Sequence, residues 1–237
     1  YDIPNMRIEY VESEPLAVNV GWWRGVGPNN TLFAAESLID ELAKKVGQDP
    51  LEFRLAHLEK SPRAAGVLKM AAEKIGWSTP ISGGSGRVGR GIAVIFAFGS
   101  YVAAACEVEV SADGDVHIRR YVAVADAGKV VNPDGIISQV EGGTVFGLTS
   151  AFWGNITVER GRIQESNFHD YRMMRIHETP PIEVHVMPST EDPGGIGEPG
   201  VTVCTPALIN AIAAATGIRL RTMPIDRDIL AGRKQNA

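Results

Sequence analysis

The stretch Gly194–Gly200, "GGIGEPG", places one acidic side chain, Glu198, among four glycines and a proline. Read from Gly195, it fits the G-x-G-x-x-G pattern of loops that bind dinucleotide phosphates. A second interpretation is that the glycines allow the backbone to approach a ligand closely and present Glu198 as a general base. A third is a plain Gly/Pro turn with an exposed glutamate. The residues around the stretch separate these interpretations.

A dinucleotide loop needs a strand that runs directly into the glycines and a helix that opens on the last one. Here the strand pattern at residues 182–187 ends seven residues too early, and we expect the helix to begin only at Thr205, with Pro206 as its first residue. The nearest later acid that could bind a ribose, Asp226, lies in the wrong setting. The apolar run "VTVCTPALINAIAAAT" instead carries the loop into the interior, where a partly desolvated carboxylate is suited to accept a proton.

Apolar spacing, caps and turn residues predict the elements that position this loop. Helices are expected at residues 31–48, 49–59, 63–77, 137–154 and 205–217, and strands at two places within 1–20 and at 91–100, 182–187 and 218–225. Two hairpins are expected, one around Asp113-Gly114 and one at 155–166 with Arg160-Gly161 at its tip. Without a regular β-α-β rhythm the fold class is α+β, with mixed sheets and packed helices. The Gly/Ser-rich linker at 78–90 predicts a first segment, 1–80, and a second, 90–237.

Composition excludes several classes of protein. The chain has 237 residues and a net charge of −5, which argues against a nucleic-acid partner. Cys106 and Cys204 lie in apolar settings and are expected to be buried free thiols, too few for an iron–sulfur cluster. The five histidines lack metal-ligand spacing, so no side-chain metal site is assigned. Asp126, before Gly128, is better explained by a turn than by a metal, and the segment around His169 by packing than by a pocket.

Three stretches in order resemble one family: "WRGVGPNNTLFAAESLIDELAKKVGQDPLEFRLAHL", "DAGKVVNPDGIISQVEGGTVFGL" and "GGIGEPG…PALINAIAAATG". The chain resembles the C-terminal part of the molybdopterin-binding subunit of the xanthine dehydrogenase/aldehyde oxidoreductase family. Within that family, it is similar to the branch with isoquinoline 1-oxidoreductase β subunits and membrane-associated aldehyde dehydrogenases. The resemblance covers nearly the whole chain and implies an oxidoreductase that hydroxylates an aldehyde or an N-heterocycle, with water as the source of oxygen.

The resemblance also implies the roles of individual residues. The family's chemistry takes place at molybdenum held by a pterin cofactor, expected in its cytosine dinucleotide form, and Glu198 matches the family's base. Ile196 and Gly197 match the backbone beside the metal. The family's R-G-aromatic-G cofactor segment matches Arg24, Gly25, Val26 and Gly27, where Val26 departs from the usual aromatic residue. Gln139 of the Q-x-E-G segment matches a cofactor ligand, because its amide can both donate and accept, whereas Glu141 is expected to serve structure.

The family's subunit is much longer than this chain, and its upstream half carries further cofactor loops. We therefore expect either an excised or processed piece, starting at Tyr1, or a separately encoded subunit, and in each case a chain that holds little cofactor alone. The implied partners are the remainder of the subunit, a [2Fe–2S] small subunit, a cytochrome c and a small-molecule substrate. The alternative function is a non-catalytic half-domain that docks to the cofactor-bearing chain or to an electron-transfer partner. Location is open between a periplasmic or membrane-associated complex and the cytoplasm.

Overall fold

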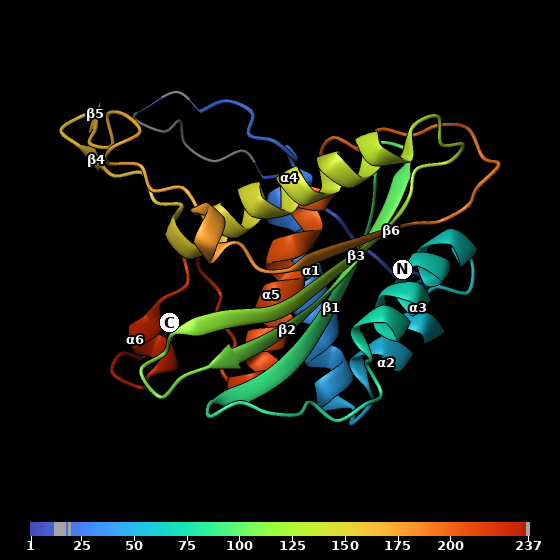
Figure 1. Cartoon of the computed structure of the whole chain (residues 1–237), viewed down its shortest axis with the longest axis horizontal. Coiled ribbons are helices and arrows are strands. Elements are labelled where there is room, and N and C mark those ends of the chain that lie inside the picture. Colours follow the sequence, from blue (N-terminus) through green and yellow to red (C-terminus); the bar gives the residue numbers. More distant parts are fainter. Residues whose placement is uncertain (12–17, 19, 236–237) are drawn as a thin grey trace.

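The structure, a computed structural model, describes residues 1–11, 18 and 20–235. Its centre is a four-stranded sheet in the order β1-β2-β3-β6 (Figure 1). The strands are β1 (Arg87–Ala97), β2 (Ser100–Val110), β3 (Val116–Asp126) and β6 (Ile182–Val186). Neighbours β1, β2 and β3 pair antiparallel, and β6 pairs parallel to β3. The mixed sheet and its covering helices confirm the predicted α+β class.

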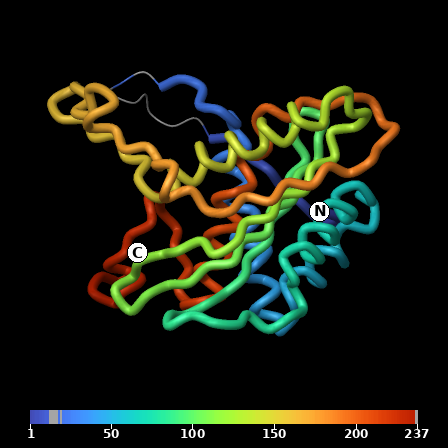
Figure 2. Tube along the Cα trace, viewed as in Figure 1, coloured from blue at the N-terminus to red at the C-terminus, as the bar shows by residue number. Residues whose placement is uncertain are grey.

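Helices cover both faces of this sheet. The α-helices are α1 (Pro28–Lys45), α2 (Pro50–Ala56), α3 (Pro62–Ile75), α4 (Pro133–Trp153), α5 (Pro199–Thr216) and the short α6 (Arg227–Leu230). Helix α3 packs on one face and α5 on the other, with α1 and α4 against α5. A small hairpin, β4 (Val158–Glu159) with β5 (Arg162–Ile163), extends away from the body (Figure 2), and one 3₁₀ turn, η1 (Ile176–Glu178), follows it.

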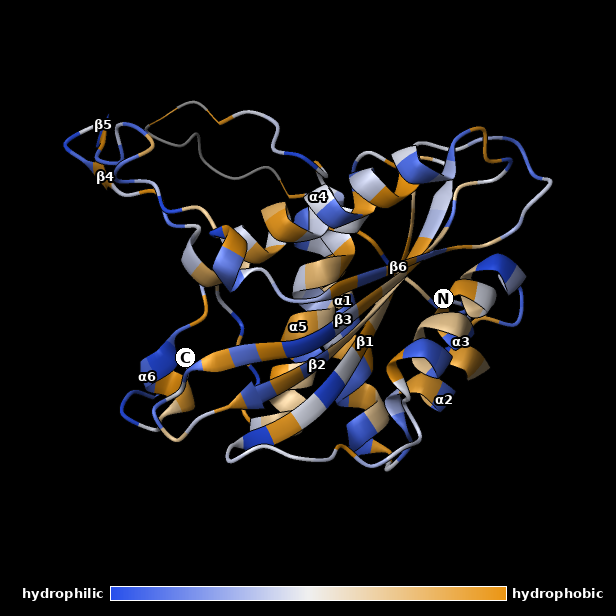
Figure 3. Ribbon diagram, in the orientation of Figure 1, coloured by the Kyte–Doolittle hydropathy of each residue, from blue (hydrophilic) through white to orange (hydrophobic). Residues whose placement is uncertain are grey.

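The alternation of the strands explains the two cores, because successive side chains of a strand point to opposite faces. In β1, Ile92 and Val94 pack in the core beneath α3, whereas Ala93 and Ile95 pack in the core beneath α5. Hydrophobic residues accordingly gather along the central strands and α5 (Figure 3). Helix α5 has the length and hydropathy of a membrane span, but 72% of that window is buried inside the fold. We therefore describe it as the core helix.

Several predicted elements are confirmed together with their caps. Asp49 caps α2 by accepting the backbone N–H groups of Leu51 and Glu52 at 2.8 and 3.2 Å. The β2–β3 hairpin turns at Gly114, whose φ is +83°. The β4–β5 hairpin turns at Arg160 and Gly161 as expected. The two thiols are buried and free as predicted, and burial raises the pKa of Cys204 to about 12.

Three predictions of elements are wrong. Helix α5 begins at Pro199 rather than at Thr205, so Pro206 lies inside it. The residues before Cys204 include β-branched side chains, which favour a helix only weakly, but packing of α5 against β1 and α4 overrides that local preference. Residues 218–225 form no strand, and neither do the described residues among 1–20; the other residues predicted there, 12–17 and 19, lie outside the described part.

Candidate active site

The loop that carries Glu198 is fastened to the end of the sheet. The backbone N–H groups of Gly194 and Gly195 donate to the carbonyl oxygens of Ala127 and Phe98 at 2.9 and 2.6 Å. Glu198 occupies the N-cap position of α5, but its side chain makes no capping hydrogen bond there. The half-buried carboxylate is therefore fixed in place by its backbone and directed to a different segment of the chain.

Arg24 joins the three segments that the sequence singled out. Its Nε donates to the carbonyl oxygen of Gly197 at 2.7 Å. Its Nη2 donates to the side-chain oxygen of Gln139 at 2.9 Å and to the backbone oxygen of the same residue at 3.3 Å. Residues that are 115 and 173 positions from Arg24 are thus held by one guanidinium group.

Gly25 contacts the carboxylate itself. Its backbone N–H donates to Oε1 of Glu198 at 2.9 Å. Gly25 is buried and has a φ of +101°, and a Cβ there would lie 2.3 Å from Oδ1 of Asn29 and 2.7 Å from Cγ2 of Thr202. Only glycine fits this position, because both the backbone conformation and the space exclude a side chain. Val26 follows with a φ of +50°, which is strained for a β-branched residue.

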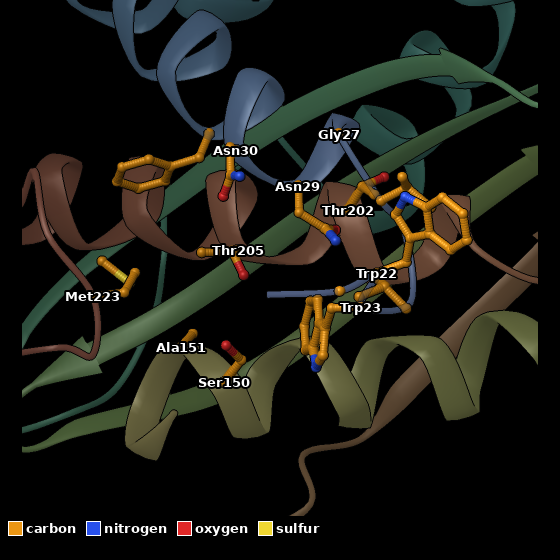
Figure 4. A pocket seen from close by; sticks show the side chains of 14 residues that line it. Trp22, Trp23, Gly27, Asn29, Asn30, Ser150, Ala151, Thr202, Thr205 and Met223 are labelled. Carbon is orange, nitrogen blue, oxygen red and sulfur yellow. The ribbon is translucent and has the colours of Figure 1, made fainter. Parts of the chain in front are cut away.

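A cavity of about 510 Å³ opens beside these residues (Figure 4). Its walls come from the 21–30 segment, from α4 through Ser150 and Ala151, and from α5 through Thr202 and Thr205. The indole of Trp23 stacks on Phe146 with ring centroids 4.8 Å apart, which fixes one wall against α4. Asn29 and Asn30, in the first turn of α1, complete the lining next to the N-cap residue Gly27.

The donor set of this cavity fits an organic cofactor held by hydrogen bonds. Hydroxyl and amide side chains line it, and the buried Oδ1 of Asn29 has no hydrogen-bond partner among the described residues. The first turns of α1 and α5 face it, and helix N-termini favour phosphate and other anionic groups. Within the described part of the chain, no three His, Cys, Asp or Glu side chains gather in a metal-binding group.

The structure brings most of the predicted site residues together: Arg24, Gly25, Gln139, Gly197 and Glu198 form one connected group. Val26 and Gly27 line the adjacent cavity, and the partly buried Ile196 packs against the core. Further residues that were not predicted line the cavity or hold the site, namely Asn29, Asn30, Phe33, Ser150, Thr202, Thr205 and Met223. No motif marked them; Asn29 and Thr202 become visible only through their contacts with Gly25.

Three other residues considered in the sequence analysis lie outside this connected group. Asp126 accepts two hydrogen bonds from Arg63, at 2.7 and 2.8 Å, and one from the N–H of Gly128 at 3.1 Å. The hydrogen bonds from Arg63 are the main reason that the pKa of Asp126 lies below its ordinary value. Its predicted role in a turn is therefore confirmed. His169 and Glu141 are exposed, the latter on α4.

Two family models and several known proteins match this chain. A family model described as "Molybdopterin cofactor-binding domain" matches residues 33–180, and a second of the same description matches residues 1–58. Isoquinoline 1-oxidoreductase subunit beta from Brevundimonas diminuta is 35% identical over 100% of this chain. A membrane-bound aldehyde dehydrogenase (pyrroloquinoline-quinone) from Gluconacetobacter polyoxogenes is 34% identical over 90% of it.

A solved structure supports the same fold. The aldehyde oxidoreductase from Desulfovibrio desulfuricans aligns with a TM-score of 0.74 and 16% identity, over 90% of this chain and 41% of its own. The chain spans about 30% of the length of the two relatives named above. The chain belongs to the molybdopterin cofactor-binding family and corresponds to part of the molybdopterin-binding subunit of the xanthine dehydrogenase/aldehyde oxidoreductase enzymes.

Proposed function

We propose that this chain contributes the catalytic base, Glu198, and one wall of the cofactor site to a molybdenum hydroxylase. The reaction we propose is the oxidation of an aldehyde or an N-heterocycle, with water as the source of the new oxygen atom. Both substrate classes follow from the names of the two relatives, an isoquinoline oxidoreductase and an aldehyde dehydrogenase. We propose the cytosine dinucleotide form of the cofactor and a [2Fe–2S] partner, with a cytochrome c as a further acceptor.

One observation carries the proposal: Arg24, Gln139, Gly197 and Glu198 converge, although they come from three distant segments. A plain turn with an exposed glutamate would not be expected to accept a hydrogen bond from a buried glycine N–H. Nor would it be expected to bind an arginine that also binds a distant helix. Preorganised groups of this kind are typical of active sites, since they need not rearrange during the reaction.

The chain's own residues then have defined tasks. The bound cofactor would supply the two-electron oxidation chemistry. Glu198 would accept a proton from the water-derived nucleophile, with Oε1 steadied by the N–H of Gly25 and the other oxygen receiving the proton. Arg24 donates to the side-chain oxygen of Gln139, and the amide N–H₂ of Gln139 would serve as a donor to the cofactor edge.

The test is Glu198→Gln in the assembled holoenzyme, with Glu191→Gln as the matched control. Glu191 lies in the same loop and is exposed, so both variants remove one negative charge. We expect turnover of an aldehyde or N-heterocycle to fall about 100-fold or more in Glu198→Gln, as expected for a lost general base, with molybdenum content unchanged. Near-normal turnover in that variant would refute the role of Glu198. Turnover in ¹⁸O-labelled water tests the oxygen source, and mass spectrometry of the released cofactor tests its nucleotide.

The second candidate function, a docking half-domain, is favoured by exposed apolar side chains around the site. Trp22 lines the cavity and is 93% exposed, and Phe98, which contacts the Glu198 loop, is 43% exposed. Large exposed apolar side chains beside a site are consistent with a surface that another polypeptide covers, and this proposal rests on that interpretation. The occupant we propose is the remainder of the subunit, since this chain spans only part of its relatives.

Co-expression of this chain with the remainder of the subunit tests docking. We expect a stable complex by size-exclusion chromatography, and weaker association when Trp22 is replaced by serine. Two results would reject the docking function. One is unchanged association after the replacement of Trp22, and the other is activity of this chain alone, without association. Docking and catalysis are compatible, and the molybdenum content of the purified chain separates them.

A further inference from the structure

The peptide unit between Arg24 and Gly25 is held from both of its ends. Its N–H donates to Oε1 of Glu198 at 2.9 Å, and its C=O accepts from Nδ2 of Asn29 at the same distance. Asn29, Glu198 and this single peptide therefore form one hydrogen-bonded chain, in which each bond polarises the next. Nothing in the sequence motifs singles out Asn29 for this place.

The orientation of the Asn29 amide is determined by its surroundings. If its oxygen faced the Arg24 carbonyl, two acceptors would oppose each other, so the nitrogen must take that side. The cost is that Oδ1 is buried without a hydrogen-bond partner among the described residues. A buried unpaired acceptor persists in a native structure only where the surrounding contacts outweigh its cost. The hydrogen bond from Asn29 to the Arg24 carbonyl, and not only the space that the side chain fills, therefore explains an asparagine at this position.

The backbone that Asn29 fastens is one that would otherwise relax. Gly25 and Val26 both have positive φ, +101° and +50°. A glycine peptide rotates readily, and the strained conformation of Val26 persists only where other contacts compensate for it. A rotated peptide would aim its carbonyl oxygen, rather than its N–H, at the Glu198 carboxylate.

We propose that Asn29 is a positioning residue: it holds the Arg24–Gly25 peptide so that the N–H faces Glu198. Asn29 does not touch the carboxylate and acts on it only through this peptide. The relevance to catalysis rests on the proposed role of Glu198 as the base. The positioning itself does not, because it concerns a peptide orientation that can be measured without cofactor or substrate.

Hydrogen exchange of the Gly25 amide, followed by NMR on the ¹⁵N-labelled 237-residue chain, tests this inference. Asn29→Asp removes the donor and keeps the shape, and Asn29→Leu removes it without adding charge. The matched control is Asn30→Asp, one position further in the first turn of α1, where the side chain is exposed. It adds the same charge near the same helix end.

We expect the Gly25 amide to exchange about tenfold faster in both Asn29 variants, which corresponds to the loss of one hydrogen bond of ordinary net strength. Amides in the middle of α1 and α5 should keep their protection, and Asn30→Asp should leave Gly25 unchanged. Unchanged Gly25 exchange in the Asn29 variants would overturn the proposal. The proposal would also be overturned if both Asn29 variants lost protection uniformly or failed to fold, or if Asn30→Asp accelerated Gly25 exchange equally. No turnover is measured in this test. The exchange result can therefore contradict the role of Asn29 while Glu198→Gln still abolishes activity, or support the role of Asn29 while Glu198→Gln leaves activity unchanged.

Discussion

The crossing of α4 and α5 has no room for a side chain at Gly147, and its replacement by alanine tests the packing that positions the site. A Cβ at Gly147 would lie 2.3 Å from Sγ of Cys204 and 2.7 Å from the backbone oxygen of Val201. Helix α4 carries Gln139 and α5 begins beside Glu198, so this contact determines how far apart the two residues lie.

The size of the effect follows from two opposed contributions. Alanine in a helix interior is favoured over glycine by about 1 kcal/mol. Inserting a methyl group into a closed contact costs about 1–3 kcal/mol, and the upper end applies here because a backbone oxygen cannot rotate away. We expect Gly147→Ala to lower the free energy of unfolding by about 2 kcal/mol, the difference between these contributions.

Gly142→Ala, in the same helix, is the matched control. Gly142 is exposed, and a Cβ there would meet no atom within 4 Å. Only the helix preference then remains, so this variant should gain about 0.5–1 kcal/mol. Urea unfolding followed by circular dichroism measures both variants. Equal stability of Gly147→Ala and Gly142→Ala would refute the argument, and Cys204→Ala should recover part of the loss at Gly147 by removing Sγ.

Two further predictions concern buried charges. Arg54 pairs with Glu36 at 2.9 Å where both side chains are fully buried, so Arg54→Met should cost about 3–5 kcal/mol by leaving a buried carboxylate unpaired. The double variant with Glu36→Leu should recover much of this in the same urea assay. Arg63 lowers the pKa of Asp126, so the stability that this pair contributes is complete above the ordinary pKa of aspartate, about 3.9, and is lost as pH falls through the lower folded-state value. Asp126→Asn should therefore be less stable than the native chain near pH 7, with the difference shrinking below about pH 4 in pH-dependent thermal unfolding.

Local signals predicted the elements whose ends are fixed by local chemistry. The Asp49-Pro50 pair gave the start of α2, because an aspartate that caps and a proline that needs no partner act within one turn. The same logic failed at Thr205-Pro206. There, α5 continues through the proline, because burial against β1 and α4 outweighs one missing hydrogen bond. The start of a helix that is predicted from capping residues alone is unreliable where most of the helix is buried.

The motifs identified which segments meet but not how they are joined. Arg24, Gln139 and Glu198 were predicted to share a site, and the structure places them together. The Glu36–Arg54 pair was missed, although Glu36 lies three residues before the buried Ile39, on the apolar face of α1. A charge at that spacing is a signal that a partner must exist. Asn29 gave no such signal, because its role depends on a turn whose shape no sequence pattern predicted.

The residue after Glu198 explains why this carboxylate is available at all. An acid at an N-cap usually accepts an N–H from the second or third residue of its own helix. In α5 the first residue, Pro199, has no N–H, and that of the third, Val201, already donates to the backbone oxygen of Glu198 at 2.9 Å. The Glu198 side chain makes no capping hydrogen bond in this turn and extends instead to the Gly25 N–H. A glutamate followed by proline at the start of a buried helix therefore suits a site that needs a carboxylate held in place by its backbone but not used to cap the helix.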